Sequence, residues 1–124
     1  MAFLFPLLIA AFATVEFRCV DPMVHDGDNI RCAGKTMRLA AIDAPEVKGS
    51  PRCRTAAQRR KAVCDFAAGE RSKQALRALV VSGSVRCRSV APPDRFGRPI
   101  VRCRIGNVDL GAQQIARGLA KAWP

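Results

Sequence analysis

Alternating apolar and polar side chains characterise the chain from residue 15 to residue 42. Residues 15–20 alternate between apolar and charged side chains, and two more alternating runs follow at 29–32 and 37–42. A period of two is typical of half-buried β-strands. Glycine-containing turns at 26–27 and 33–35 separate the three runs. The pattern therefore predicts a meander of three consecutive strands.

The middle of the chain predicts a long loop followed by a helix. Residues 43–65 have no clean periodicity and contain two prolines, a glycine and a basic run at 59–61. Long loops in compact domains are usually functional or disordered. From 66 to 81 the apolar residues recur at helical spacing, and Gly83 is placed to end the helix.

Two further strands and a closing helix complete the predicted order. Residues 84–90 and 100–105 have strand patterns on either side of the turn at 92–97, and a final helix extends from about Asp109, a suitable N-cap, to Gly118. Five short strands with one helix between the third and the fourth is the order of an OB-fold barrel. We therefore expect an α+β fold, mainly β, built as a five-stranded OB-fold barrel with flanking helices.

Six widely spaced cysteines indicate disulfides. No Cys-x-x-Cys pair is present and there is one histidine, which excludes zinc-ribbon and multi-histidine metal sites. If the last two strands form a hairpin centred near Arg95, Cys87 lies opposite Cys103, which suits a cross-strand disulfide. With the others assigned by strand position and elimination, the candidate pairs are Cys87–Cys103, Cys19–Cys32 and Cys53–Cys64. Other connectivities stay open, as do six reduced cysteines in the core of a cytosolic protein.

The same register sets arginines opposite one another on the two strands. The facing pairs are Arg86–Arg104 and Arg88–Arg102. Like charges directly opposite each other destabilise a sheet. The four arginines therefore indicate either an anionic partner or a solvated face on which the side chains splay apart.

Length and charge narrow the classes of function. The chain has 124 residues, which suits one small domain, and a formal net charge of +11 at pH 7. Such an excess favours a polyanionic partner: nucleic acid, an anionic membrane or an acidic polysaccharide. No stable protein partner is implied, and we expect a monomer.

The first fourteen residues are uncharged and almost entirely apolar. A membrane span needs about 20 such residues, so we expect no span. The small-x-small sequence at 11–13 has the form of a signal-peptidase site. We expect a signal peptide at 1–13 and one domain at 14–124, in a secreted or periplasmic protein. The alternative is a buried N-terminal strand or helix.

Carboxylates and arginines gather at predicted strand ends and turns, in four stretches at 25–30, 37–39, 42–46 and 94–98. Carboxylates clustered without histidine or cysteine suit a hard cation such as Ca²⁺, which prefers oxygen ligands. Arginines beside them suit a phosphate, because the guanidinium grips two oxygens and stabilises charge on phosphorus. A remaining carboxylate, Glu46, can orient or deprotonate a water molecule. Each stretch alone is better explained by turn acids or surface arginines, but together they predict metal-assisted phosphodiester hydrolysis.

In this order and strand pattern, the stretches resemble the staphylococcal-nuclease-like (thermonuclease) family. The elements that carry the resemblance are D-G-D at 26–28, R-L at 38–39, D-x-P-E at 43–46, D-R-F-G-R at 94–98 and A-R-G-L-A-K at 116–121. They span most of the chain after residue 14. The resemblance implies an OB-fold barrel with flanking helices that cleaves DNA and RNA with Ca²⁺ at low sequence specificity and leaves 3′-phosphorylated products.

The resemblance also implies roles for individual residues at a metal site. Asp28 and Asp43 match the metal-binding carboxylates of the family, and the carbonyl of Ala44 matches a backbone metal ligand. Ala44 replaces the threonine that is usual at this position, which is compatible with metal binding through the carbonyl alone.

Three further residues match the catalytic groups of the family. Glu46 matches the glutamate assigned to activating the attacking water. Arg38 and Arg98 match the arginines that hold the scissile phosphate and offset the charge of its transition state. Phe96 stands where tyrosine is common, so a hydroxyl contact to the nucleotide end is lost.

A function of a different class stays open, namely a non-catalytic cationic OB-fold module that binds nucleic acid. Surfaces of that kind stack bases on exposed aromatic side chains, and this chain has six phenylalanines, one tryptophan and no tyrosine. A module that only binds would be expected to lack at least one of the matched catalytic residues. The sequence therefore favours the nuclease.

Overall fold

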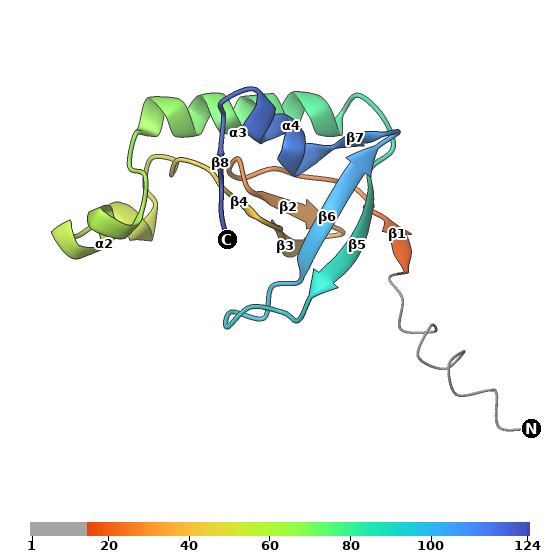
Figure 1. Cartoon of the computed structure of the whole chain (residues 1–124), viewed down its shortest axis with the longest axis horizontal. Coiled ribbons are helices and arrows are strands. Elements are labelled where there is room, and N and C mark those ends of the chain that lie inside the picture. The colour runs from red at the N-terminus through yellow and green to blue at the C-terminus, as the bar shows by residue number, and fades with distance from the viewer. Residues whose placement is uncertain (1–14) are drawn as a thin grey trace, which may run out of the picture.

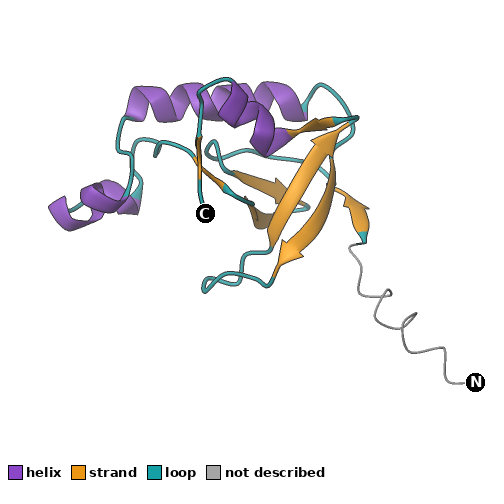
Figure 2. Ribbon diagram, viewed as in Figure 1, coloured by secondary structure: helices purple, strands orange, loops and turns teal. Residues whose placement is uncertain are grey.

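The structure, a computed structural model, describes residues 15–124 and has an α+β architecture (Figures 1 and 2). The signal peptide expected at 1–13 lies outside the described residues. Helices α3 (Phe66–Val80) and α4 (Leu110–Ala116) pack on one side of the main sheet, and α2 (Ala56–Lys61) stands apart from both (Figure 1). Among the helices of residues 15–124, none has the length and apolar character needed to cross a bilayer.

Six strands form a mixed sheet with the order β1-β5-β6-β3-β2, and β7 pairs with β6. β3 and β6 run parallel, whereas the other neighbours are antiparallel. β4 and β8 form a separate antiparallel pair. The strand bounds are Glu16–Arg18 (β1), Asn29–Cys32 (β2), Lys35–Leu39 (β3), Ile42–Asp43 (β4), Arg86–Ala91 (β5), Ile100–Ile105 (β6), Val108–Asp109 (β7) and Lys121–Ala122 (β8).

The first strand has a different neighbour from the one the pattern predicts. β1 pairs with β5, and the N–H of Cys19 extends this edge by donating to the carbonyl of Val85. The chain then turns at Asp21, whose φ is 47°, and an isolated bridge from Met23 to Arg31 connects it to β2. The expected meander is therefore wrong in its first pairing. Because no ladder joins β1 to β2 within residues 15–124, these residues do not form a closed barrel.

The third predicted strand, at 37–42, is interrupted in the structure. β3 ends at Leu39 and β4 begins at Ile42, with Ala41 between them at a φ of 64°. A residue at positive φ reverses the local direction of an extended chain. The interruption turns Asp43 away from the path of β3.

The region 43–65, expected to be a loop, contains the 3₁₀-helix η1 (Pro51–Cys53) and helix α2. A capping box begins α2: the hydroxyl of Thr55 accepts from the N–H of Gln58, and the side chain of Gln58 accepts from the N–H of Thr55. The cap is visible as T-x-x-Q, but the helix has six residues and buries none of them. It therefore has no apolar stripe that would reveal it in the sequence.

The two helices predicted from the sequence are confirmed. Asp65 caps α3 by accepting from the N–H of Ala68, and Asp109 caps α4 in the same way with Ala112. Leu76 and Val80 of α3 are buried in the core beneath the sheet. Both helices were predicted at the correct positions, because apolar spacing and capping residues are signals that depend only on near neighbours in the sequence.

All six cysteines form disulfides, which confirms the three expected pairs Cys19–Cys32, Cys53–Cys64 and Cys87–Cys103. Four of these cysteines belong to the hydrophobic core and are at most 5% exposed. The predicted register is also confirmed, because Cys87 lies opposite Cys103 between the two facing arginine pairs. Two of the three cross-links therefore hold the core of this small domain together.

Removal of the Cys87–Cys103 disulfide by replacing both residues with alanine is expected to cost about 2–5 kcal/mol of stability. The disulfide holds two arginine pairs opposite each other, so part of the loss is expected to disappear at high salt, which screens their repulsion. Urea unfolding at low and high salt measures both effects. The control variant replaces Cys53 and Cys64 with serine, because that disulfide joins no facing arginine pair. A loss that does not change with salt would contradict the role assigned to repulsion.

Candidate functional site

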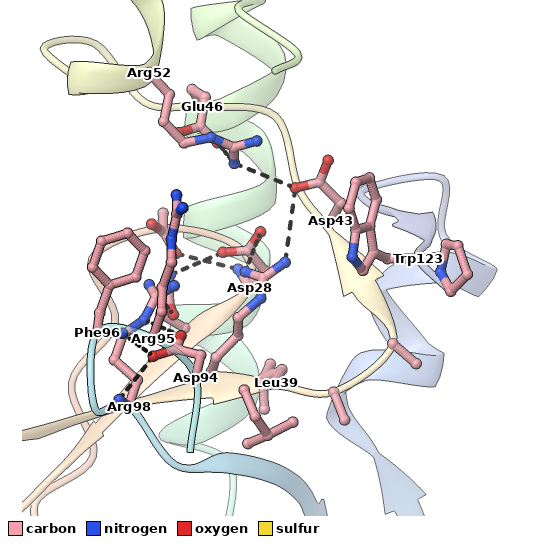
Figure 3. A pocket seen from close by; sticks show the side chains of 17 residues that line it. Asp28, Leu39, Asp43, Glu46, Arg52, Asp94, Arg95, Phe96, Arg98 and Trp123 are labelled. Carbon is pink, nitrogen blue, oxygen red and sulfur yellow. Dashed lines mark hydrogen bonds and ion pairs between the residues drawn. The ribbon is translucent and has the colours of Figure 1, made fainter. Parts of the chain in front are cut away.

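A cleft of about 540 Å³ is lined by charged side chains (Figure 3). It lies between the start of β2, the end of β3, the segment after β4 and the turn before β6. Most of the residues matched to the family line it, namely Asp28, Arg38, Asp43, Glu46 and Arg98. The structure therefore brings together four stretches that are far apart in the sequence.

Asp28 is buried at the end of the D-G-D turn, directly before β2. Its Oδ2 accepts a hydrogen bond from the backbone N–H of Ala44 at 2.9 Å, and its Oδ1 accepts from Nδ2 of Asn29 at 2.9 Å. Nη1 of Arg38 lies 3.3 Å from the same Oδ2. Asp28 thus ties the turn before β2 to β3 and to the segment after β4, and Ala44 joins the site through its backbone.

The surroundings of Asp28 disfavour its ionised form. Burial raises the pKa of Asp28 to about 7, and the neighbouring carboxylate of Asp26 adds to the rise. Arg38 and the N–H of Ala44 lower this pKa, but they do not compensate for the burial. A carboxylate in such a position gains from a cation placed beside it, because an opposite charge favours the ionised form.

Asp43 ends β4 and is 3% exposed. Its Oδ1 lies 4.0 Å from Nη2 of Arg38 and 3.7 Å from Nη1 of Arg52. Its Oδ2 is buried and has no hydrogen-bond partner among residues 15–124. A buried carboxylate oxygen of this kind is costly unless an ion, a water or a ligand satisfies it. Oδ2 of Asp43 is therefore an open ligand position.

Glu46 follows β4 and is oriented through both carboxylate oxygens. Its Oε1 accepts from the hydroxyl of Ser50 at 2.7 Å, and its Oε2 lies 3.3 Å from Nη1 of Arg52. The backbone N–H of Glu46 donates to the carbonyl of Val63 at 2.7 Å, which fixes the chain itself. The carboxylate is therefore held at the edge of the cleft with little freedom to rotate.

The sequence pattern does not single out Arg52, yet its guanidinium lies between Glu46 and Asp43 (Figure 3). It belongs to η1, directly before Cys53, and the Cys53–Cys64 disulfide fixes this segment. Several arginines occur in the same stretch, and none has a local signal that distinguishes it. Only the tertiary contact with the two acids identifies Arg52.

Helix α3 supports the Glu46 segment through a close approach at Gly69. A Cβ at Gly69 would lie 2.1 Å from the carbonyl oxygen of Glu46 and 3.0 Å from that of Pro45. Only glycine lets the two backbones come this close. The position of Glu46 therefore depends on the absence of a side chain at residue 69.

Replacement of Gly69 by alanine is expected to destabilise the protein by about 1–3 kcal/mol, because the backbones must separate. In an unconstrained helix the same exchange would stabilise by about 1 kcal/mol. Urea unfolding measures whether the free energy of unfolding falls or rises in the variant. The control is Gly111→Ala in α4, where a Cβ would lie 3.3 Å from a side-chain atom of Ile42 and no closer than 3.8 Å to a backbone atom of another segment. A gain in stability for Gly69→Ala would contradict the close approach.

The turn at 94–98 is organised around one carboxylate. Oδ1 of Asp94 accepts from the backbone N–H groups of Phe96 and Arg98 at 2.9 Å, and its Oδ2 accepts from Nε of Arg98 at 2.7 Å. Nη1 of Arg98 donates to Oδ1 of Asn29 at 3.4 Å, while Nδ2 of Asn29 donates to Asp28. The amide of Asn29, a residue of the stretch 25–30 that had no predicted role, therefore couples the D-G-D turn to Arg98.

Two exposed aromatic side chains flank the cleft. Phe96 is 68% exposed, and the guanidinium groups of Arg95 and Arg98 lie 4.8 and 5.4 Å from the centre of its ring. Trp123 is 47% exposed and lies beside Asp43 (Figure 3), because β8 pairs with β4. Exposed rings of this kind are faces on which nucleobases stack. The strand pairing that brings Trp123 to the cleft is not visible in the local sequence.

The acids of the cleft fit a hard cation held by few protein ligands. The open Oδ2 of Asp43 and the buried carboxylate of Asp28 supply oxygen donors, which Ca²⁺ prefers. Among residues 15–124, the carboxylates of Asp28, Asp43 and Glu46 do not converge as a group of three metal-ligating side chains. A cation there would therefore depend on Asp28, Asp43 and the backbone of Ala44, together with water or substrate oxygens.

A second hollow of about 620 Å³ adjoins the cleft and shares five lining residues with it, namely Asp26, Glu46, Arg52, Phe96 and Arg98. The two hollows leave room on both sides of these residues, as a chain-like substrate requires. A scan of the chain against protein-family models and a search of curated proteins found no match, so the geometry of the cleft carries the functional argument.

Proposed function

We propose that the protein is a Ca²⁺-dependent nuclease that hydrolyses phosphodiester bonds of DNA and RNA with low sequence specificity and leaves 3′-phosphorylated products. The observation that carries the proposal is the composition of the cleft. Two buried carboxylates, one of them with an open oxygen, share the cleft with Glu46 and with the two arginines matched to the family, Arg38 and Arg98. This set contains an oxygen-rich cation site, a phosphate-binding site and a candidate base.

In this proposal Asp28, Asp43 and the carbonyl of Ala44 hold the cation. When bound, Ca²⁺ supplies positive charge that offsets the charge of the phosphate and of its transition state. Arg38 contributes a guanidinium already placed next to both acids, and its Nη2 is fixed by donating to the carbonyl of Ile42 at 3.0 Å. A guanidinium fixed in this way can bind phosphate oxygens without reorganising.

Glu46 and Arg98 complete the proposed chemistry. Glu46 accepts a proton from a water molecule as the water oxygen forms a bond to phosphorus. Arg98, held by Asp94, binds the phosphate oxygens as negative charge builds on them. The bond between phosphorus and the 5′-oxygen breaks, the 5′-oxygen takes up a proton from solvent water, and the phosphate stays on the 3′-oxygen.

We also propose that the sheet is an OB-fold barrel, open between its first two strands, of the staphylococcal-nuclease-like family. The parallel pair β3–β6, the β1–β5 pair and the bridge from Met23 to Arg31 support this fold, because they link all five main strands in a ring interrupted at one place. Helix α3 lies between the third and fourth strands of this ring in the sequence, as the OB-fold requires.

The three disulfides support export to the periplasm or the medium, where such bonds persist. In those compartments the substrates would be free DNA and RNA. We propose that the protein acts as a monomer.

One observation favours a cationic module that binds nucleic acid without cleaving it. Arg52 lies 3.3 Å from Glu46 and 3.7 Å from Asp43, so a positive charge already occupies the space between these acids. Such a guanidinium competes with a metal ion for the carboxylates. For catalysis, Arg52 has to move aside or turn toward the substrate, which its 45% exposed side chain allows.

The proposal is tested by incubating the protein, with its disulfides intact, with single-stranded DNA and RNA in Ca²⁺ and in chelator. We expect both nucleic acids to be degraded in Ca²⁺ only. The products are expected to carry a 3′-phosphate group that a phosphatase removes. Tight binding without cleavage under both conditions would instead establish the binding module.

A further inference from the structure

The outer face of β1, β5 and β6 carries five exposed arginines, which we call the arginine face. One row across the strands is Arg18–Arg86–Arg104, and the next is Glu16–Arg88–Arg102. The residues that alternate with them, Cys87 and Cys103, point into the core. The arginine face therefore lies on the side of the sheet opposite to the core and to helix α3 (Figure 1).

Acidic side chains neutralise only part of the arginine face. Glu16 bonds to Arg104, with contacts of 2.6 and 3.0 Å, and Asp109 lies 3.8 Å from Arg102. The remaining arginines form no ion pair among residues 15–124, although Glu16 lies opposite Arg88, and residues 1–14 contain no acid. These three are Arg18, Arg86 and Arg88. A net positive surface remains.

The fold keeps these like charges together by a covalent bond. Arg86 faces Arg104 and Arg88 faces Arg102, an arrangement that destabilises a sheet. The Cys87–Cys103 disulfide lies between the two pairs and prevents the strands from separating. Phosphate groups would remove the repulsion, since each arginine can bind phosphate oxygens with its guanidinium.

The arginine face is continuous with the cleft along β6. Ile100, at the start of β6, lines the cleft, and the next outward-facing residues of the strand are Arg102 and Arg104. Outward residues on one strand are about 6.6 Å apart, and neighbouring strands are about 4.8 Å apart. A strand of nucleic acid that leaves the cleft at Ile100 therefore meets positive charge at close intervals on β6 and β5.

We propose that the arginine face is an accessory phosphate-binding surface that holds the backbone of a nucleic acid strand beyond the cleft. The choice of nucleic acid over another polyanion rests on the proposed function, because the argument is continuity with a phosphate-binding cleft. The surface would raise the affinity for long substrates and leave the affinity for a fragment that fills only the cleft unchanged.

The test compares two double variants that lose the same charge. Arg86→Gln with Arg88→Gln removes two arginines that form no ion pair, and the control removes Arg71 and Arg77 from the exposed side of α3 in the same way. Fluorescence anisotropy in chelator measures binding of a labelled trinucleotide and of a long single-stranded DNA over a range of salt concentrations. Urea unfolding verifies that each variant is folded. Arg18→Gln, on the edge strand β1, is a further variant.

For the arginine-face variant we expect long DNA to bind about 10-fold more weakly and the slope of log affinity against log salt to fall by about 1.4, which is about 0.7 for each lost phosphate contact. We expect the trinucleotide to bind as before and the control variant to bind both DNAs normally. An equal loss in both double variants, or no loss in either, would overturn the proposal. The proposal would also be overturned if the arginine-face variant binds vesicles of anionic lipid more weakly but binds DNA as before. That result would identify the face as a membrane-binding surface. Binding is measured in chelator, where no cleavage is expected. If the protein binds DNA through the arginine face but does not cleave it in Ca²⁺, the proposed nuclease activity is refuted and the binding surface is not.

Discussion

Replacement of Glu46 by glutamine is expected to lower the rate of Ca²⁺-dependent cleavage by about 10²- to 10⁴-fold. Glutamine keeps the size of the side chain and can still accept from the hydroxyl of Ser50, but it cannot take a proton from water. The affinity for DNA, measured in chelator, is not expected to fall, because the exchange removes a negative charge that repels phosphate. The experiment measures initial cleavage rates of a short single-stranded substrate at saturating Ca²⁺.

Glu70→Gln provides the matched control for Glu46→Gln, since Glu70 is an exposed carboxylate on α3 that lines neither hollow. Its cleavage rate is expected to stay close to that of the unmodified protein. If Glu46→Gln cleaves at an unchanged rate, another group activates the water. The role proposed for Glu46 would then be wrong even if the protein is a nuclease.

Replacement of Asp43 by asparagine is expected to remove the stabilisation that Ca²⁺ gives to the fold. A ligand at about 100 times its dissociation constant stabilises the native state by about 2.7 kcal/mol. Asp43 supplies the open carboxylate oxygen of the cleft, and asparagine lacks the charge that attracts the cation. The measurement is the difference in unfolding free energy between Ca²⁺ and chelator for each protein, so a change in the metal-free stability cancels.

Asp21→Asn is the control for Asp43→Asn. Asp21 is exposed and has a φ of 47°, a conformation that asparagine tolerates. This variant is expected to keep the full response to Ca²⁺. If Asp43→Asn responds to Ca²⁺ as strongly as the unmodified protein does, the cation does not bind at this carboxylate.

The residues of the candidate site that belong to short sequence motifs could be predicted from the sequence. Asp28 follows a turn glycine, Asp43 and Glu46 flank a proline, and Arg98 closes a turn that Asp94 organises. Each motif alone is typical of a turn, and only the combination of the motifs in this order singles out these residues. The cleft that joins them requires β3 to lie parallel to β6, which no local motif specifies.

Arg52, Asn29 and Trp123 mark the limit of prediction from the sequence. Arg52 resembles several other arginines of its segment until the Cys53–Cys64 disulfide places it over the acids. Asn29 occupies an ordinary strand position, and its role depends on the distant guanidinium of Arg98. All three owe their place to contacts between distant parts of the chain.

By itself, the sequence determined the two main helices, most strands and the register of the last hairpin, and it gave the three disulfides as candidate pairs while other connectivities stayed open. Periodicity, capping residues and turn glycines specify these features through interactions between near neighbours or across one hairpin. Only the tertiary structure decided that β1 pairs with β5, that the third strand breaks at Ala41 and that β8 brings Trp123 to Asp43. These features depend on which distant surfaces bury the most apolar area together, and the pattern of a single segment does not contain that information.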